Sequence, residues 1–304
     1  MRRIALLLLS FLSWVCLALP GFAANAQPDV FVGKIEAHPA LWTVHGPKGT
    51  AYLFGSIHIL PPNMEWRTPK VAAAMKAADT FVFEIPMDES TKQSIANFVR
   101  AHAFLPKGTT LPSLLDGKAD KDYRDALAAS GISAAALIDK RPWFAALVIE
   151  VGYMNQRNLS PDAGVDRRVY ADALARGVKD FRALETPEEQ FRLLMPEDRD
   201  LEIKEFDESL KEVLRDKGEL GNLIDAWASG DEARLGKLMN EGLKADPRME
   251  KALFEDRNAR WVNQIAAMLN ENRTFFITVG AGHLAGPKGV PALLRQRGFK
   301  VDGP

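Results

Sequence analysis

The spacing of apolar and polar positions changes several times along this chain, and these changes predict an α/β fold. Residues 41–44 and 51–54 are short apolar runs of strand length, and residues 46–49, Gly-Pro-Lys-Gly, supply turn chemistry between them. A third apolar run, at 80–83, follows a helix that begins with Thr-Pro at 68–69. The chain is therefore predicted to open with an antiparallel hairpin, a helix and a buried strand.

Helical spacing of apolar residues dominates the middle of the chain. Helices are expected at residues 90–103, 120–129, 142–153, 166–176, 187–194 and 197–214, and again between 220 and 270. A short strand at 178–184 interrupts them, and a strand at 274–279 and a helix at 290–297 follow them. The expected fold is α/β, with a central mixed sheet, an antiparallel N-terminal hairpin, flanking helices and a large helical insertion over about residues 90–270. Residues 27–304 are expected to form a single domain, because no Ser/Gly/Pro-rich linker divides them.

The first 26 residues have the pattern of a secretory signal peptide. Arg2 and Arg3 precede an apolar run over residues 4–19, and residues 24–26, Ala-Asn-Ala, supply a small-x-small cleavage site. A retained membrane anchor is the weaker interpretation, because a transmembrane helix needs roughly 20 apolar residues. We expect cleavage after Ala26, a periplasmic or secreted mature protein, and no stable membrane insertion after cleavage.

The amino-acid composition argues against cysteine-based chemistry and against a nucleic-acid partner. The single cysteine, Cys16, lies in the signal segment, so the mature chain is predicted to have no disulfide, thiolate nucleophile or thiolate metal ligand. Removing the two arginines of that segment from the 39 Lys and Arg residues leaves 37 against 40 Asp and Glu residues, a net charge of −3. Because a nucleic-acid-binding protein needs a basic surplus, no nucleic-acid partner is expected. The sequence does not indicate an oligomeric state.

The candidate catalytic or metal-binding residues follow the ends of four predicted strands. Two of the five histidines, His58 and His283, follow their strands in the same pattern, Gly-x-x-His. Two glutamates, Glu84 and Glu185, directly follow two other strands. Singly, each has a simpler explanation, either a hydrogen-bonded loop histidine or a helix-capping glutamate. Because the strands of one sheet deliver side chains to a common edge, the combination predicts a site.

Two imidazoles and one or two carboxylates form a ligand set for a borderline divalent metal such as Zn²⁺, Mn²⁺, Fe²⁺ or Co²⁺. Such a metal would lower the pKa of a bound water, a second carboxylate would act as general base, and Arg257 is the candidate cation for a developing oxyanion. The sequence motifs of common zinc proteases, serine hydrolases and phosphate-binding loops are absent from the chain. Hydrolysis would therefore use a different scaffold.

The chain resembles the TraB/PrgY/GumN family, which is related to the animal Tiki proteins. The matching segments are residues 41–44 (Leu-Trp-Thr-Val), 52–58 (Tyr-Leu-Phe-Gly-Ser-Ile-His), the strand that ends at Glu84, 164–166 (Gly-Val-Asp), 184–186 (Leu-Glu-Thr) with Gln190, Arg257-Asn258 with Trp261, and 279–287 (Val-Gly-Ala-Gly-His-Leu-Ala-Gly-Pro). Together they cover nearly all of the mature chain. Ser56 stands where many relatives have threonine, and this departure leaves the histidine spacing intact.

The resemblance implies an α/β fold and, for the Tiki branch, metal-dependent proteolysis that uses manganese or cobalt. It implies that the paired Gly-x-x-His histidines and a glutamate belong to the site. We predict that the metal ligands are His58, Glu84 and His283, and that the catalytic residues are Glu84, Asp166, Glu185 and Arg257. The expected cofactor is Mn²⁺ or Co²⁺, with Zn²⁺ or Fe²⁺ as alternatives.

Two hypotheses about function follow. The first is an exported metal-dependent hydrolase, best matched to a peptidase, that acts on peptides or small polar substrates. The second is a non-catalytic periplasmic protein that sequesters a peptide or other ligand in the same cleft. Two of the residues also have structural explanations: Asp166 opens a helix, where an aspartate caps, and Arg257 can be an ion-pairing arginine beside a core tryptophan, Trp261.

Overall fold

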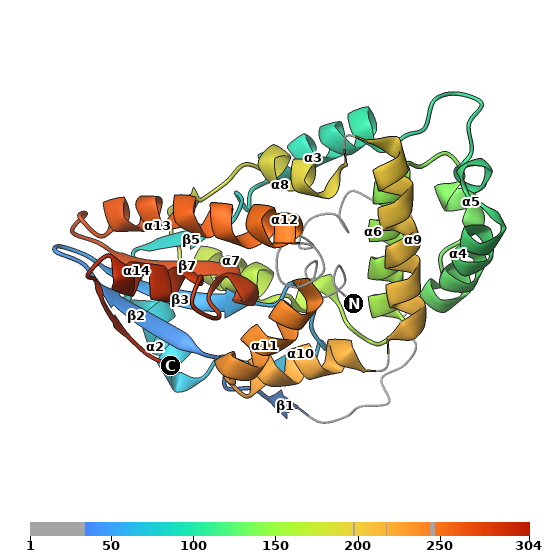
Figure 1. The fold of residues 1–304 in the computed structure, drawn as a ribbon. Helices are drawn as coiled ribbons and strands as arrows, with labels where there is room; N and C mark the ends of the chain where they lie inside the picture. The colour runs from blue at the N-terminus through green and yellow to red at the C-terminus, as the bar shows by residue number, and fades with distance from the viewer. Residues whose placement is uncertain (1–33, 197, 217, 244–246) are drawn as a thin grey trace.

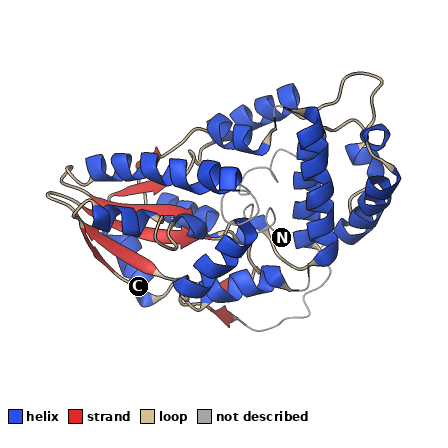
Figure 2. Cartoon of the chain, viewed as in Figure 1, coloured by secondary structure: helices blue, strands red, loops and turns tan. Residues whose placement is uncertain are grey.

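The structure is a computed structural model that describes residues 34–196, 198–216, 218–243 and 247–304. The predicted signal segment, residues 1–26, lies outside these described residues. The described chain combines one large mixed sheet with many helices, so the expected α/β class is confirmed (Figures 1 and 2).

The large sheet has the strand order β6-β5-β7-β3-β2-β8. Its strands are β2 (Leu41–His45), β3 (Thr50–Ser56), β5 (Thr80–Phe83), β6 (Asp180–Ala183), β7 (Thr274–Gly280) and β8 (Lys300–Asp302). Strands β3, β7, β5 and β6 are parallel, whereas β2 pairs antiparallel with β3 and with β8. The predicted hairpin is the pair β2 and β3. A small parallel sheet joins β1 (Ile35–Glu36) to β4 (Met64–Glu65).

Strand β7 lies between β3 and β5, so a strand from the C-terminal part of the chain occupies the middle of the sheet. Ser56 of β3 is paired with Gly280 of β7, and Phe83 of β5 is paired with Thr278 of β7. The parallel strands therefore end close to one another, and the residues that follow them emerge at one edge of the sheet. This edge carries the candidate site.

The helices in chain order are α2 (Pro69–Ala77), α3 (Glu89–His102), α4 (Gly117–Ser130), α5 (Ala134–Leu137), α6 (Pro142–Asn155), α7 (Val165–Ala175), α8 (Pro187–Leu194), α9 (Arg199–Arg215), α10 (Glu219–Ala228), α11 (Glu232–Leu243), α12 (Pro247–Glu250), α13 (Asp256–Met268) and α14 (Val290–Gln296). A π-helical turn, Lys251–Glu255, leads from α12 into α13. The predicted start of α2 is confirmed, because the Thr68 side chain accepts a hydrogen bond from the backbone N–H of Val71.

Helices cover both faces of the large sheet. On one face, Leu53 and Ile277 belong to an apolar cluster that includes side chains of α13 and α14. On the other face, Phe276 lies between Phe54 and Phe81, with ring centroids 5.7 Å and 5.6 Å away, in a larger cluster that includes side chains of α2 and α7. The central strands β3, β7 and β5 are therefore buried on both sides, as their near-continuous apolar sequences require.

Helices α4, α6 and α9 pack together at the end of the molecule away from the sheet (Figure 1). Helix α6 is buried at every position from Pro142 to Met154, because its apolar residues leave no polar face. Glu202 of α9 accepts hydrogen bonds from the Arg141 guanidinium and from the backbone N–H of Trp143, at 2.9 Å and 3.2 Å, which satisfies the start of α6.

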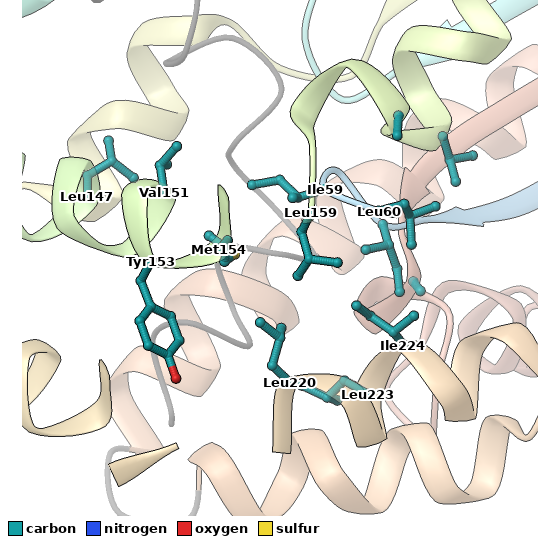
Figure 3. Packing of buried hydrophobic residues seen from close by; sticks show 14 of the residues in the cluster. Ile59, Leu60, Leu147, Val151, Tyr153, Met154, Leu159, Leu220, Leu223 and Ile224 are labelled. Carbon is teal, nitrogen blue, oxygen red and sulfur yellow. The ribbon is translucent and has the colours of Figure 1, made fainter. Parts of the chain in front are cut away.

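One buried apolar cluster connects the helical end to the sheet edge. Figure 3 shows side chains of α6, α10 and the loop after β3 within this cluster, including Leu147, Leu223, Ile59 and Leu60. Leu60 and Ser160 exchange two backbone hydrogen bonds, at 3.2 Å and 2.8 Å. The loop that follows β3 is therefore buried. Apolar side chains pack around it, and the backbone of Ser160 fixes it by hydrogen bonds.

Candidate active site

His58 lies in the loop after β3, and the start of α7 holds it. Its Nδ1 atom lies 2.7 Å from Oδ1 of Asp166, and both side chains are buried. The backbone N–H of Val165 donates to the carbonyl of Ile57 at 3.0 Å. A Cβ atom at Gly164 would lie 2.3 Å from the carbonyl oxygen of His58, so only glycine permits this approach. The Gly-Val-Asp motif thus fixes His58, and proton transfer or metal ligation at this ring would take place on Nε2.

His283 lies in the tight turn after β7 and is completely buried. Its Nδ1 atom lies 2.6 Å from Oδ1 of Asn258, and its Nε2 atom lies 2.9 Å from Nη1 of Arg257. Because the amide oxygen accepts and the guanidinium donates, this arrangement places the proton on Nδ1 and the lone pair on Nε2. The rings of Trp261 and Phe254 lie 4.2 Å and 4.8 Å from the imidazole and fix its plane.

Arg257, on the first turn of α13, binds the side chains of Glu84 and Glu185, which follow β5 and β6. Its Nε atom donates to both carboxylate oxygens of Glu185, at 2.9 Å and 3.0 Å, and Nη2 donates to Oε2 of Glu84 at 2.8 Å. Nη1 donates to the backbone carbonyl of Leu253 at 3.1 Å as well as to His283. The guanidinium is 0% exposed, so it acts on a substrate only by exchanging one of these partners.

Each of the two glutamates has further donors. Glu84 accepts the backbone N–H of Gly280 on Oε1 at 2.6 Å and the Gln190 amide on Oε2 at 2.7 Å. Glu185 accepts the indole N–H of Trp261 at 3.0 Å and the Arg260 guanidinium at 3.1 Å. These bonds compensate for the loss of water around two buried carboxylates.

Burial and neighbouring charges shift the pKa values of the site in different directions. Burial lowers the pKa of His58, but the charge and the hydrogen bond of Asp166 outweigh burial, so the pKa lies above its ordinary value. Burial raises the pKa of Glu84, and Arg257 and His58 offset this only in part. Burial and the repulsion of Arg257 hold the pKa of His283 well below its ordinary value. His283 is therefore a neutral imidazole, whereas the protonated forms of His58 and Glu84 are both favoured relative to the free side chains.

All six residues singled out in the sequence lie in this buried region: His58, Glu84, Asp166, Glu185, Arg257 and His283. Arg257 connects Glu84, Glu185 and His283 directly, and Asp166 pairs with His58. Sequence reasoning assigned no role to Asn258 or Gln190, which orient His283 and Glu84. The sequence did contain a signal for both, because Asn258 directly follows Arg257 and Gln190 lies in the first turn of α8, the helix that follows Glu185.

A cavity of about 320 Å³ lies beside His283. Met239 and Phe254 form apolar walls, Asn258 reaches it from α13, and Lys288 lines it together with two glutamates, Glu250 and Glu255. Lys288 forms ion pairs with both of these carboxylates. Since Phe254 and Asn258 also contact His283, a molecule in this cavity would touch the residues that hold the imidazole.

The donor set of the predicted metal site is present, but its arrangement does not fit a three-ligand metal. Within the described ranges, no three His, Cys, Asp or Glu side chains are grouped in a way that could hold an ion. The Nε2 lone pair of His283 already accepts from Arg257, and a metal bond needs that same lone pair. Whether the protein binds a metal stays a prediction.

Within the described part of the chain, no helix has both the length and the apolar character needed to cross a bilayer.

Comparisons with known proteins bear on the family of this chain. A family model described as the TraB/PrgY/gumN family matches residues 40–303. An uncharacterized protein of Treponema pallidum (strain Nichols) is 21% identical over 308 residues, which cover 96% of this chain and 89% of that protein. Metalloprotease TIKI2 of Danio rerio is 30% identical over 93 residues, which cover 27% of this chain and 18% of TIKI2. No solved structure matches the chain significantly.

Proposed function

This chain belongs to the TraB/PrgY/gumN family, and we propose that within the family it is an exported hydrolase that cleaves peptides or related polar carbonyl compounds. The observation that carries the proposal is the buried His58–Asp166 pair at the edge of the sheet that also carries Glu84. Sites of general acid–base catalysis typically contain an oriented histidine with a shifted pKa beside a second titratable group. The partial similarity to a metalloprotease agrees with this class of reaction.

In the proposed reaction, His58 transfers the proton. Water attacks the carbonyl carbon while Nε2 of His58 takes one of its protons, and the imidazolium that results is stabilised by Asp166. The imidazolium then gives this proton to the leaving nitrogen or oxygen, so His58 returns to its starting state. Asp166 acts through His58 and is therefore a positioning residue.

The remaining predicted residues have supporting roles in this proposal. Burial raises the pKa of Glu84, and in this proposal Glu84 is the second titratable group, whose charge acts on His58. Glu185 holds Arg257 through both carboxylate oxygens. Arg257 in turn holds Glu84 and keeps His283 neutral, so its positive charge acts on the site through these neighbours.

A divalent metal is a separate proposal, with Mn²⁺ or Co²⁺ expected and Zn²⁺ or Fe²⁺ as alternatives. The predicted ligands His58, Glu84 and His283 are chemically suitable donors, although His283 could bind an ion only if Arg257 gave up its hydrogen bond to Nε2. A bound ion would act as a Lewis acid toward the carbonyl. Elemental mass spectrometry of residues 27–304, purified without chelator and again after loading, tests this. Stoichiometric metal that is lost in both His58→Ala and His283→Ala supports it, and no metal in the loaded protein overturns it.

Export is proposed from the signal pattern of residues 1–26. N-terminal sequencing of the protein recovered from outside the cytoplasm should begin at Gln27. A protein that keeps Met1 in that fraction would contradict cleavage after Ala26.

A ligand-sequestering protein is the second candidate, and one observation favours it. The charged groups of the site are extensively paired with one another, as in a structural ion-pair network. The two candidates differ in what is recovered after long incubation of a bound peptide. Intact peptide indicates binding only, whereas fragments that appear with the wild type and not with His58→Gln indicate hydrolysis.

A further inference from the structure

The predicted metal position and the Arg257 guanidinium compete for the same atoms. We infer that Arg257 is the resident cation of this site, and that a divalent metal can use His283 as a ligand only after Arg257 gives up its hydrogen bond to Nε2. This inference goes beyond the proposed hydrolysis and does not depend on it, because it concerns only which cation occupies the site.

The lone pair of His283 is already used by Arg257. A neutral imidazole has one ring nitrogen that donates and one that accepts. Asn258 Oδ1, 2.6 Å from Nδ1, fixes Nδ1 as the donor, and Arg257 Nη1, 2.9 Å from Nε2, takes the only lone pair in the ring plane. A metal such as Zn²⁺ would have to lie about 2.0–2.1 Å from that nitrogen along the same direction. The metal and this N–H group therefore exclude each other.

Several hydrogen bonds hold Arg257 in place. Glu185 and Glu84 bind the guanidinium through Nε and Nη2, and the Leu253 carbonyl, on the π-helical turn before α13, binds Nη1. Three different elements of the fold thus bind one guanidinium group. The planar guanidinium has several N–H donors and can bind all three at once, whereas the ammonium group of a lysine cannot do so in this geometry. Of these side-chain hydrogen bonds, the one to His283 reaches a neutral group, whereas those to Glu84 and Glu185 reach carboxylates, so His283 is the hydrogen-bond partner most readily exchanged.

The charges around Arg257 also disfavour a second cation at this site. Glu84 and Glu185 are both in direct contact with Arg257, and Arg260 contacts Glu185 from the same helix at 3.1 Å. The two carboxylates therefore face the buried guanidinium of Arg257 and the half-exposed guanidinium of Arg260. A dication beside Arg257 would place a second buried cation against the same two carboxylates, which is unfavourable. Removing Arg257 would leave the carboxylates ready for a dication.

The test is the affinity for Co²⁺, measured by calorimetry and by the visible absorption of the bound ion, in the metal-free full-length mature protein. We expect Arg257→Met to bind Co²⁺ at least tenfold more tightly than the wild type. The gain should disappear in the double variant Arg257→Met/His283→Asn, because His283 is the ligand that Arg257 had occupied. Arg260→Met is the matched control: it removes an arginine from Glu185 without touching His283 and should bind Co²⁺ like the wild type.

Arg257→Lys keeps the inference testable if Arg257→Met does not fold. A lysine retains the buried positive charge, but its single ammonium group cannot reach both carboxylates and His283 in the arginine's geometry. Its Co²⁺ affinity should therefore also exceed that of the wild type. The inference is overturned if every folded Arg257 variant binds Co²⁺ no more tightly than the wild type, or if the tighter binding persists without His283.

Discussion

The imidazole of His58 and the carboxylate of Asp166 lie 2.7 Å apart although 108 positions separate them in the chain. The loop after β3 supplies the histidine, and the first turn of α7 supplies the aspartate. Asp166 thus combines two functions, because the same first-turn position that suits an aspartate at a helix start also faces the imidazole. This contact is the basis of the proposed catalytic role of His58.

Replacing Asp166 by asparagine should change the pH dependence of hydrolysis in a defined direction. Asp166 raises the pKa of His58, and the neutral imidazole is the form that accepts a proton. Loss of the carboxylate lowers that pKa, so the acid limb of the kcat/KM profile should move to lower pH, while the maximum falls about 10- to 100-fold as His58 loses its orientation.

Asp172→Asn provides the matched control for this profile. Asp172 lies on the same helix and bonds to Arg67 at 2.6 Å, away from His58. Its profile should coincide with that of the wild type. An acid limb of Asp166→Asn that stays in place or moves to higher pH would show that Asp166 does not set the pKa of His58.

Gly164→Ala should destabilise the fold at the point where α7 meets the His58 loop. The added methyl group would lie 2.3 Å from the His58 carbonyl oxygen, so the backbone must shift at a cost of about 1–3 kcal/mol. Urea unfolding measures this cost. Gly221→Ala on α10 is the comparison, because its methyl group would meet open space and alanine favours the helix by up to about 1 kcal/mol. Equal stability of the two variants would contradict the close approach at Gly164.

Glu185→Gln should be among the most destabilising polar substitutions of the site. It removes one of the two carboxylates that neutralise the buried Arg257, and breaking a buried ion pair on one side costs about 3–5 kcal/mol. The midpoint of chemical denaturation should fall accordingly. Glu188→Gln, which loses an exposed pair with Arg192 on the next helix, should change stability by less than about 0.5 kcal/mol. Similar midpoints for both variants would show that Glu185 is not needed to balance Arg257.

The sequence predicted those parts of the fold that depend on local pattern. The hairpin around Gly46 to Gly49, the start of α2 at Thr68 and the strands that end before Glu84 and His283 all follow from turn residues, capping residues and apolar runs. Their common edge could be predicted because parallel strands deliver their ends together. The meeting of His58, Glu84, Glu185 and His283 was thus accessible from the pattern of strands, whereas the site role of Asp166, on a helix, was expected mainly from the family resemblance.

The features that the sequence did not predict depend on contacts between distant segments. Strand β7 inserts between β3 and β5, and nothing in its apolar run specifies that neighbour. Strand β8, three residues long, is too short to show a strand pattern and exists through its pairing with β2. The partners of Arg257 were also missed, because the number of groups that a buried guanidinium binds is decided by tertiary packing.

The central claim, that His58 performs hydrolysis, is tested most directly by incubating residues 27–304 with a peptide library and comparing the cleavage rate with that of His58→Gln. The matched control is His45→Gln, which changes an exposed histidine bonded to Asp302 at the far end of the hairpin. We predict cleavage by the wild type and by His45→Gln, and a rate about 10²- to 10⁴-fold lower for His58→Gln. Equal rates for the wild type and a folded His58→Gln variant, whether measurable or at background, would contradict the claim.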